Sequence, residues 1–114
     1  MPLQLCSTVR KEGHLELSLV EVDMPNPGED DVVIRVEASP INPSDLGLLF
    51  GMADMSTATL SGTGSNSVLT ATIPEAMMRQ VVARVDQSLP AGNEGAGVVV
   101  SAGSSERAQS LMGK

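Results

Sequence analysis

The sequence has very few aromatic residues, and this limits how its core can be built. Phe50 is the only aromatic side chain among 114 residues, and there is no Trp or Tyr. Aromatic rings bury large areas in most cores, so this core has to be assembled from Leu, Val, Ile, Met and Ala. A chain of this length buries about two-thirds of its unfolded surface, which predicts one modest domain of marginal stability.

Cysteine and histidine are equally scarce, since the chain has one of each, Cys6 and His14. A single cysteine excludes an intrachain disulfide and a Cys-rich zinc site, and we expect Cys6 to be an inert buried thiol in the first strand. His14 follows a glycine turn on the polar side of a strand and has no partner motif. We therefore expect it to be solvated and do not select it as catalytic.

Basic charge and long apolar runs are also lacking. The chain has 7 Lys and Arg against 14 Asp and Glu, a net charge of −7. Binding to a phosphate backbone needs clustered basic residues, so we expect no nucleic-acid partner. There is no run of eighteen apolar residues, and residues 1–5 lack the plan of a secretion signal. These absences predict a cytoplasmic protein without a membrane partner.

Alternating apolar residues predict three strands before residue 40, punctuated by turns. Residues 3–7 form a short strand, and residues 14–22 a longer one whose alternation shifts near Val20, which predicts a β-bulge. Residues 32–38 have the alternation of a half-buried strand. With a further valine-rich strand near residues 97–101, the pattern favours a mainly β barrel or sandwich with little helix.

Residues 52–91 differ in character from the strands around them. Residues 56–67 are small and polar, which predicts a mobile loop. A helix is predicted next, because Thr72 and Glu75 have the spacing of a capping box. Its apolar stripe would pack on the barrel and consists of Met77, Met78, Val81, Val82 and Val85. A last short helix is predicted to start at residues 104–106.

Polar side chains gather where the strand 32–38 ends. Pro40 and Pro43 cannot continue a strand ladder, and the residues after them predict a short helix that starts near Ser44. Asn42, Ser44 and Asp45 are thereby held on a rigid corner. Taken alone, the pattern Asn-Pro-Ser-Asp is more typical of a turn with a helix cap than of a catalytic site.

Three stretches carry a family resemblance. The segment VVIRVEASPINPSDLGLLFG at residues 32–51 resembles the start of the catalytic domain of the medium-chain dehydrogenase/reductase superfamily, in its zinc-free quinone oxidoreductase branch. The segment NEGAGVVVSAG at residues 93–103 resembles the glycine-rich strand of that superfamily, and PNPGEDDVV at residues 25–33 agrees with both. The resemblance covers about residues 14–51 and 91–103.

The resemblance implies a mainly β fold, the GroES-like partly open β-barrel with a few short helices. Residues 1–114 would be the N-terminal GroES-like domain, with an inserted loop and helix at residues 52–91. The dinucleotide fingerprint of a glycine-rich turn between a strand and a helix is absent from the sequence. We therefore expect the Rossmann domain of the family to be missing from this chain, and the chain to be a fragment.

The resemblance also implies chemistry. Zinc-dependent relatives place a Cys and a His where this chain has Asn42 and Asn93, and a neutral amide is a poor zinc ligand, so we expect no metal. The zinc-free branch implies hydride transfer from NADPH or NADH to a quinone or enone. Asn42 would donate to the developing oxyanion and Ser44 would relay a proton, as the catalytic residues.

Other residues are expected to support the site. Asp45 would hold the loop, and Asn93 and Glu94 are candidates for substrate contact or structural support. Gly95 and Gly97 are predicted to allow close packing of strands. The main cofactor-binding site is expected outside this chain.

The sequence leaves alternatives open. The leading interpretation is the substrate-side domain of an NAD(P)H-dependent oxidoreductase, inactive as a fragment, whose parent can form a homodimer. The alternative is a non-catalytic barrel that serves co-chaperonin-like assembly or binds a small ligand. The choice between NADPH and NADH and the identity of the substrate are open as well.

Overall fold

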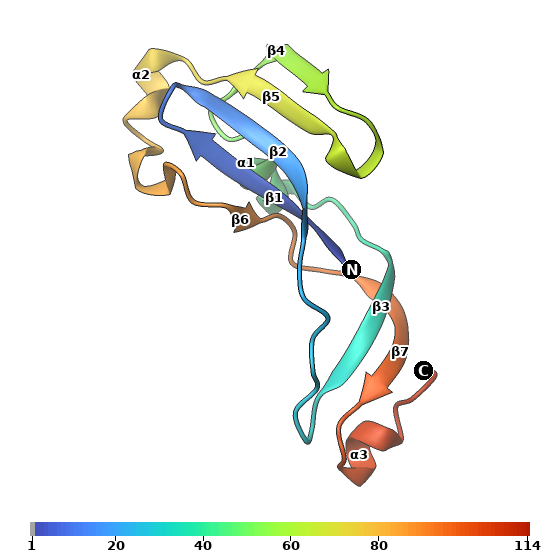
Figure 1. Cartoon of the computed structure of the whole chain (residues 1–114). Helices are drawn as coiled ribbons and strands as arrows, with labels where there is room; N and C mark the ends of the chain where they lie inside the picture. Colours follow the sequence, from blue (N-terminus) through green and yellow to red (C-terminus); the bar gives the residue numbers. More distant parts are fainter. Residues whose placement is uncertain (1) are drawn as a thin grey trace. The chain divides into compact units, whose positions relative to one another are not determined.

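Strands dominate residues 2–114, the part of the chain that the computed structural model describes (Figure 1). The strands are β1 Leu3–Arg10, β2 His14–Glu21, β3 Val32–Ala38, β4 Asp54–Ser61, β5 Val68–Thr72, β6 Leu89–Pro90 and β7 Ala96–Ala102. The α-helices are α1 Leu46–Leu49, α2 Glu75–Met78 and α3 Glu106–Gln109, and the 3-10 turns are η1 Pro43–Asp45, η2 Gly64–Asn66 and η3 Val82–Arg84. The predicted mainly β class with a few short helices is confirmed, and within the described residues the strands form no closed barrel.

The chain divides into two compact units. Unit 1 consists of Met1–Val22 and Asn42–Ala91, and unit 2 consists of Asp23–Ile41 and Gly92–Lys114. Unit 1 contains a five-stranded antiparallel sheet in the order β4-β5-β2-β1-β6. Unit 2 contains the antiparallel pair β3-β7 together with α3.

The strands β1 and β2 pair without interruption from Leu3–Glu21 to Arg10–His14. The β-bulge predicted near Val20 is therefore wrong. Leu19 and Val20 are successive residues of a regular strand and lie on opposite faces of the sheet, and both are partly exposed, at 39% and 38%. Register shifts occur instead in the β3-β7 pair and in the β4-β5 pair.

The core of unit 1 lies at one end of this sheet. It consists of the buried residues Val9, Leu15, Ile73 and Val81, with Ala53, Met78 and Val85 packed against them. The predicted helix does begin near Glu75, but α2 makes only one turn, and its N-cap is Pro74 rather than Thr72, which belongs to β5. Val85 leaves the helical path to form a parallel bridge with Val9, so the predicted stripe is split and Val82 is 67% exposed.

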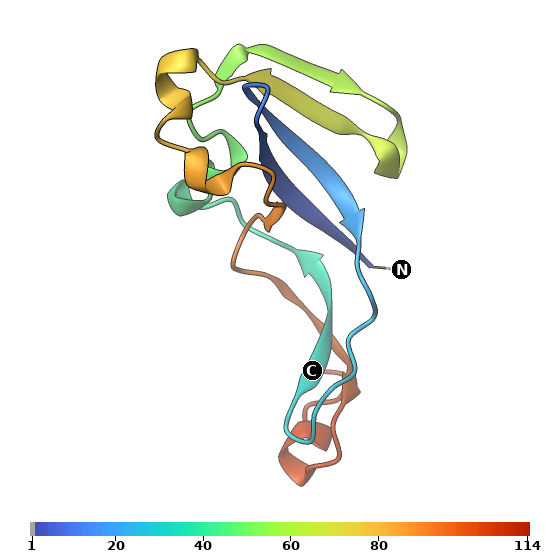
Figure 2. The same ribbon diagram turned by 60° about the vertical axis from the view of Figure 1, so that its left-hand side comes forward.

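The segment 56–67, predicted to be a mobile loop, forms β4 and η2 of a hairpin with β5. Figure 2 shows this hairpin continuing the sheet next to β2. The Thr57 hydroxyl accepts the Thr72 amide at 2.8 Å and donates to the Asp54 carbonyl at 2.6 Å, in the interval where the β4-β5 register shifts. The prediction was wrong because threonine suits strands and its hydroxyl here substitutes for a ladder bond.

Unit 2 is a two-stranded ribbon with α3 at one end. The β3 strand has the predicted bounds, and α3 begins after Ser105, whose hydroxyl accepts the Ala108 amide at 3.1 Å, as the predicted helix start requires. The half-burial predicted for β3 is wrong, because Ile34 is 48% and Val36 61% exposed. Alternation places the apolar side chains of β3 on one face, but a two-stranded ribbon has no second layer that would cover this face.

None of the helices within residues 2–114 is long and apolar enough to cross a bilayer.

Candidate functional site

The predicted corner lies in unit 1 and is organised by Asp45. The Asp45 carboxylate accepts the backbone N–H of Asn42 at 2.8 Å, and the Asn42 carbonyl accepts the N–H of Asp45 at 2.9 Å. Asn42 has an extended backbone, and Pro43 fixes φ at the first position of η1. Asp45 is only 6% exposed, so its carboxylate is committed to the turn. This is the loop-holding contact predicted for Asp45.

The corner is attached to the sheet through Ser7 and Arg84. The Ser7 hydroxyl is fully buried and donates to the carbonyl of Leu48 in α1 at 2.6 Å. The Arg84 guanidinium donates to the Ser7 hydroxyl at 3.1 Å and to the carbonyl of Gly47 at 3.5 Å. These bonds join β1, α1 and η3, so the helix that follows the corner has a fixed position in unit 1.

Sequence reasoning missed Arg84, although one signal was present. Arg84 lies between Val82 and Val85 in a chain with few basic residues. Its Nε atom is buried and has no hydrogen-bond partner within residues 2–114. An arginine inside an apolar stretch usually serves a specific contact, because burying a guanidinium without partners costs free energy.

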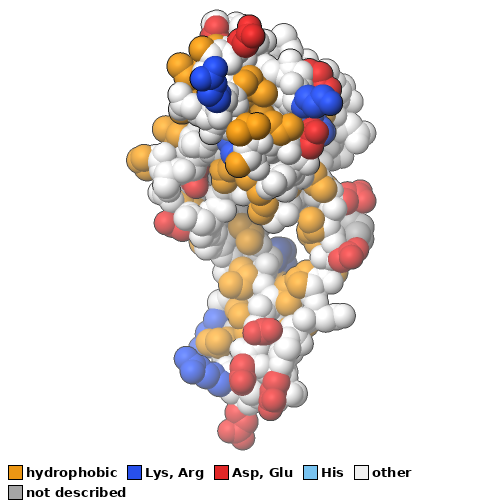
Figure 3. Space-filling view, turned by 90° about the vertical axis from the view of Figure 1, so that its left-hand side faces the viewer, with side chains coloured by type: hydrophobic (Ala, Val, Ile, Leu, Met, Phe, Trp, Pro, Cys, Tyr) orange, Lys and Arg blue, Asp and Glu red, His pale blue; other side chains and the backbone are white. Residues whose placement is uncertain are grey.

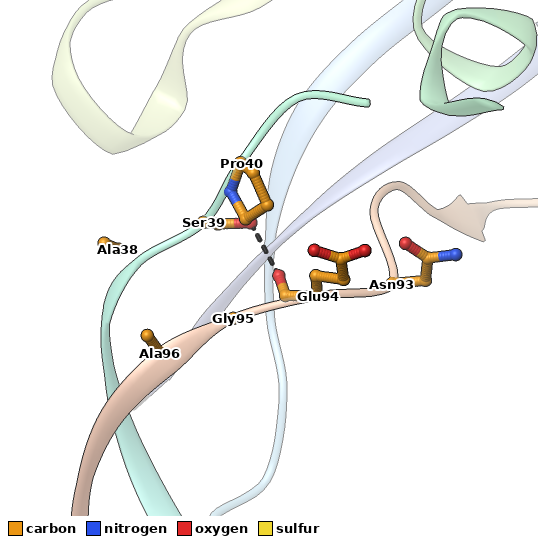
Figure 4. A pocket seen from close by; sticks show the side chains of 7 residues that line it. All are labelled: Ala38, Ser39, Pro40, Asn93, Glu94, Gly95 and Ala96. Atoms are coloured by element: carbon orange, nitrogen blue, oxygen red, sulfur yellow. Dashed lines mark hydrogen bonds between the residues drawn. The ribbon is translucent and has the colours of Figure 1, made fainter. Parts of the chain in front are cut away.

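Unit 2 contains an open groove of about 790 Å³ where its two strands end. Figure 4 shows its lining, which consists of Ala38, Ser39, Pro40, Asn93, Glu94, Gly95 and Ala96. The Ser39 hydroxyl donates to the Glu94 carbonyl at 2.8 Å and ties the two segments together. Asn93 and Glu94 are exposed on this groove, and Ser39 is a further residue that sequence reasoning missed.

The predicted site residues thus fall into two groups. Asn42, Ser44 and Asp45 lie within one turn of unit 1, where Ser44 is exposed and its hydroxyl has no hydrogen bond within the described part of the chain. Asn93 and Glu94 lie together on the groove of unit 2. Each group has polar atoms that face solvent beside a fixed backbone.

A separate charged cluster lies on β1 and β2. Glu16 accepts from Arg10 at 3.1 Å and pairs with His14 at 3.2 Å, and Arg10 also approaches Asp86 at 3.6 Å. Partial burial alone would raise the pKa of Glu16, but the hydrogen bonds from His14 and Arg10 lower it below its usual range. The hydrogen bond to Glu16 in turn raises the pKa of Arg10. His14 therefore has a carboxylate partner, which its sequence context did not predict.

No group of three or more His, Cys, Asp and Glu side chains is placed to hold a metal ion within residues 2–114. Asn42 and Asn93, the two positions that the hypothesised family resemblance would match to zinc ligands, both carry neutral amide side chains. The absence of zinc stays a prediction, and its test is given in the Discussion.

No family model and no curated protein matches the chain significantly. The family resemblance of the three stretches therefore stays a hypothesis that rests on the residues themselves.

Proposed function

We propose that this chain is the substrate-side domain of a zinc-free oxidoreductase that uses NADPH or NADH to reduce quinones or related electron-poor carbonyl compounds. The observation that carries the proposal is the Asn42–Asp45 corner. The buried Asp45 carboxylate fixes the backbone of Asn42. Ser44, the residue before Asp45, is exposed to solvent. Pre-organised donors are what charge stabilisation in a transition state requires.

The proposed chemistry assigns one role to each residue. A bound nicotinamide cofactor would supply a hydride to the electron-poor acceptor, and the acceptor's carbonyl oxygen would take up the negative charge that develops. The Asn42 side-chain amide donates a hydrogen bond to that oxygen as its charge grows. Ser44 passes a proton from water to the oxygen, which completes the reduction. The domain that binds the dinucleotide would lie outside residues 1–114.

The finer fold belongs to the same proposal. The antiparallel pairing and short helices are compatible with a GroES-like, partly open barrel, and the family places its polar corner directly after a strand, as Asn42 follows β3 here. We also infer a cytoplasmic location, because the composition has no feature of a secreted or membrane protein.

The test uses the complete gene product that contains residues 1–114. Steady-state oxidation of NADPH with a quinone acceptor should be measurable, and Asn42→Ala should lower kcat by about 10²-fold or more, the usual effect of losing one oxyanion donor. Asn26→Ala, in the exposed turn before β3, is the matched control and should leave kcat unchanged. Equal activity of the Asn42→Ala variant, or no activity of the complete product, would overturn the proposal.

The 114-residue chain alone provides a second arm. It has no glycine-rich turn before a helix to seat a pyrophosphate, so calorimetry should show no tight binding of NADPH. Micromolar binding by this chain would show that it is a complete enzyme of another design.

A second candidate function is favoured by one surface of unit 1. Leucine side chains line an open groove of about 310 Å³ on the sheet, and we call this surface the leucine face: Leu5, Leu17, Leu19, Leu60 and Leu69. Leu60 is 70% exposed, and uncovered apolar surface is typical of an assembly or binding module. Native mass spectrometry separates the two candidates, because a ring of identical chains would favour assembly over catalysis.

A further inference from the structure

A second groove in unit 1, of about 570 Å³, lies beside α2 and η3 and combines apolar and basic side chains. Met78 and Arg79 come from the end of α2, Val82 and Val85 from η3 and the residue after it, and Lys11 from the turn between β1 and β2. Figure 3, which faces α2, shows hydrophobic side chains gathered between basic ones on this part of the surface. The groove is separate from the corner and from the leucine face.

The apolar part of the groove follows from the broken helix. Met78 and Val85 pack against the buried core with one side and line the groove with the other. Val82 is 67% exposed, because η3 turns it away from the core. Methionine is flexible and polarisable, so a surface that contains it adapts to ligands of varied shape.

The basic side chains of the groove form no ion pairs in the part of the chain that the structure describes. Lys11 and Arg79 are exposed and make no ion pair or side-chain hydrogen bond within residues 2–114. Arg10 and Arg35, by contrast, are both paired with glutamate. The chain has twice as many acidic as basic residues, so most cations could find an acidic partner. Two cations without such a partner beside one apolar groove are therefore not expected by chance.

We propose that this groove binds an amphipathic anion, an aliphatic carboxylate whose chain lies on Met78, Val82 and Val85 and whose head group contacts Lys11 and Arg79. The charges are complementary, and guanidinium groups bind carboxylates through paired hydrogen bonds. The volume lies within the range of about 300–1,000 Å³ that small-molecule sites have. The site does not depend on the proposed oxidoreductase activity.

The experiment titrates the 114-residue chain with decanoate below its micelle concentration and follows methyl resonances by NMR. We expect saturable binding with a Kd of about 0.1–1 mM, as ligand efficiencies for a molecule of this size indicate. The shifts should be confined to the methyl groups of Met78, Val82 and Val85. Shifts confined to the methyl groups of Leu5 and Leu60 would place the ligand on the leucine face and overturn the assignment.

Three ligand controls separate charge from apolarity. Acetate has the head group without the chain, decanol has the chain without the charge, and decyltrimethylammonium reverses the charge. Each should bind at least about fivefold more weakly than decanoate, because each loses one of the two contributions. Equal binding of decanol would show a purely apolar surface and contradict the proposal. Binding of an acidic peptide in place of decanoate would contradict it as well.

Variants test the two cations directly. Lys11→Gln with Arg79→Gln should weaken decanoate binding about tenfold, since each exposed ion pair contributes about 0.5–1 kcal/mol. Both side chains are exposed, so circular dichroism should show an unchanged fold. Arg107→Gln with Lys114→Gln, which removes two exposed charges of unit 2, is the matched control. If it weakens binding as much, the effect is that of net charge and the proposed site is wrong.

Discussion

The backbones of β3 and β7 approach closely at Gly97 because this residue has no side chain. A Cβ atom on Gly97 would overlap the carbonyl group of Arg35 in the paired strand β3. A Cβ on Gly95 would press against the side chain of Val36 at 3.2 Å, which can move more easily than backbone. The prediction that these glycines permit close strand packing is therefore confirmed, and Gly97 is the stricter of the two positions.

Gly97→Ala should therefore destabilise unit 2 by about 2–3 kcal/mol, because backbone atoms would have to move. Urea unfolding followed by circular dichroism measures this, since the chain has no Trp or Tyr for fluorescence. Gly47→Ala is the control. A Cβ there meets nothing within 4 Å, and alanine in the helix α1 should be neutral or stabilising by up to about 1 kcal/mol. Similar stabilities for the two variants would contradict the overlap.

Glu16 gives unit 1 a dependence on pH. Its pKa in the folded chain is lowered, despite partial burial, by hydrogen bonds from His14 and Arg10. A lowered pKa means that the carboxylate stabilises the fold above its ordinary pKa of 4.5 and loses this contribution as pH falls through the folded value. Glu16→Gln should lower stability at pH 7 by about 0.5 kcal/mol, and the difference should be smaller at pH 3, where more of the carboxylate is protonated.

Thermal unfolding at the two pH values measures this effect. Glu12→Gln, in the exposed turn, is the matched control and should change little at either pH. A Glu16→Gln variant as stable as the unmodified chain at pH 7 would show that the cluster contributes nothing.

At the scale of elements, the strands β1, β2 and β3 and the start of α3 could be predicted because their signals are local. Alternation and capping act over a few residues, and these elements have the expected positions. The β4-β5 hairpin could not be predicted from composition. It depends on a bond between Thr57 and Thr72, fifteen residues apart, and small polar sequences resemble loops when their partners are unknown.

The candidate site divides in the same way. The turn at Asn42 and Asp45 could be predicted from Asn-Pro-Ser-Asp, because proline and a capping acid act locally. The attachment of that turn through Ser7 and Arg84 joins residues 77 positions apart, and no local pattern encodes such a contact. The long helix predicted from the apolar stripe failed for a similar reason: α2 ends at Met78, and Val85 pairs with Val9 instead of continuing a helix.

Thr57→Val tests how the hairpin is held. It removes the acceptor of the Thr72 amide while keeping the branched shape, so it should cost about 0.5–1.5 kcal/mol. Amide exchange of Thr72 should become faster in this variant. Thr59→Val is the control, because Thr59 is exposed and pairs with Thr70 in register. If both variants exchange at the same rate at residue 72, the hydroxyl has no structural role.

At the scale of the whole molecule, the single cysteine and the single histidine lie far apart. In the β1-β2 register Cys6 is paired with Ser18, and His14 is paired with Arg10. Cys6 and His14 are therefore four residues apart along the strands, or about 13 Å. Metal ligands have to lie within about 2–2.3 Å of the ion, so these two side chains do not share one.

We therefore expect purified protein to contain no stoichiometric zinc after dialysis, which elemental analysis by mass spectrometry would measure. Asn93→Ala should leave the zinc content unchanged. One zinc ion per chain that is lost in this variant would end the zinc-free interpretation and the chemistry proposed for Asn42.

The division of the chain has a consequence for its synthesis. All strands of the five-stranded sheet are complete at Pro90, but β3 is made about 60 residues before its partner β7. At a translation rate of roughly 5–20 residues per second, β3 waits for about 3–12 s on the ribosome without a pairing strand. During this interval Ile34 and Val36 belong to an unpaired apolar strand in a nascent chain. Chaperone binding to nascent chains should therefore be strongest after β3 has emerged and should weaken once β7 has paired with it and satisfied its backbone hydrogen bonds.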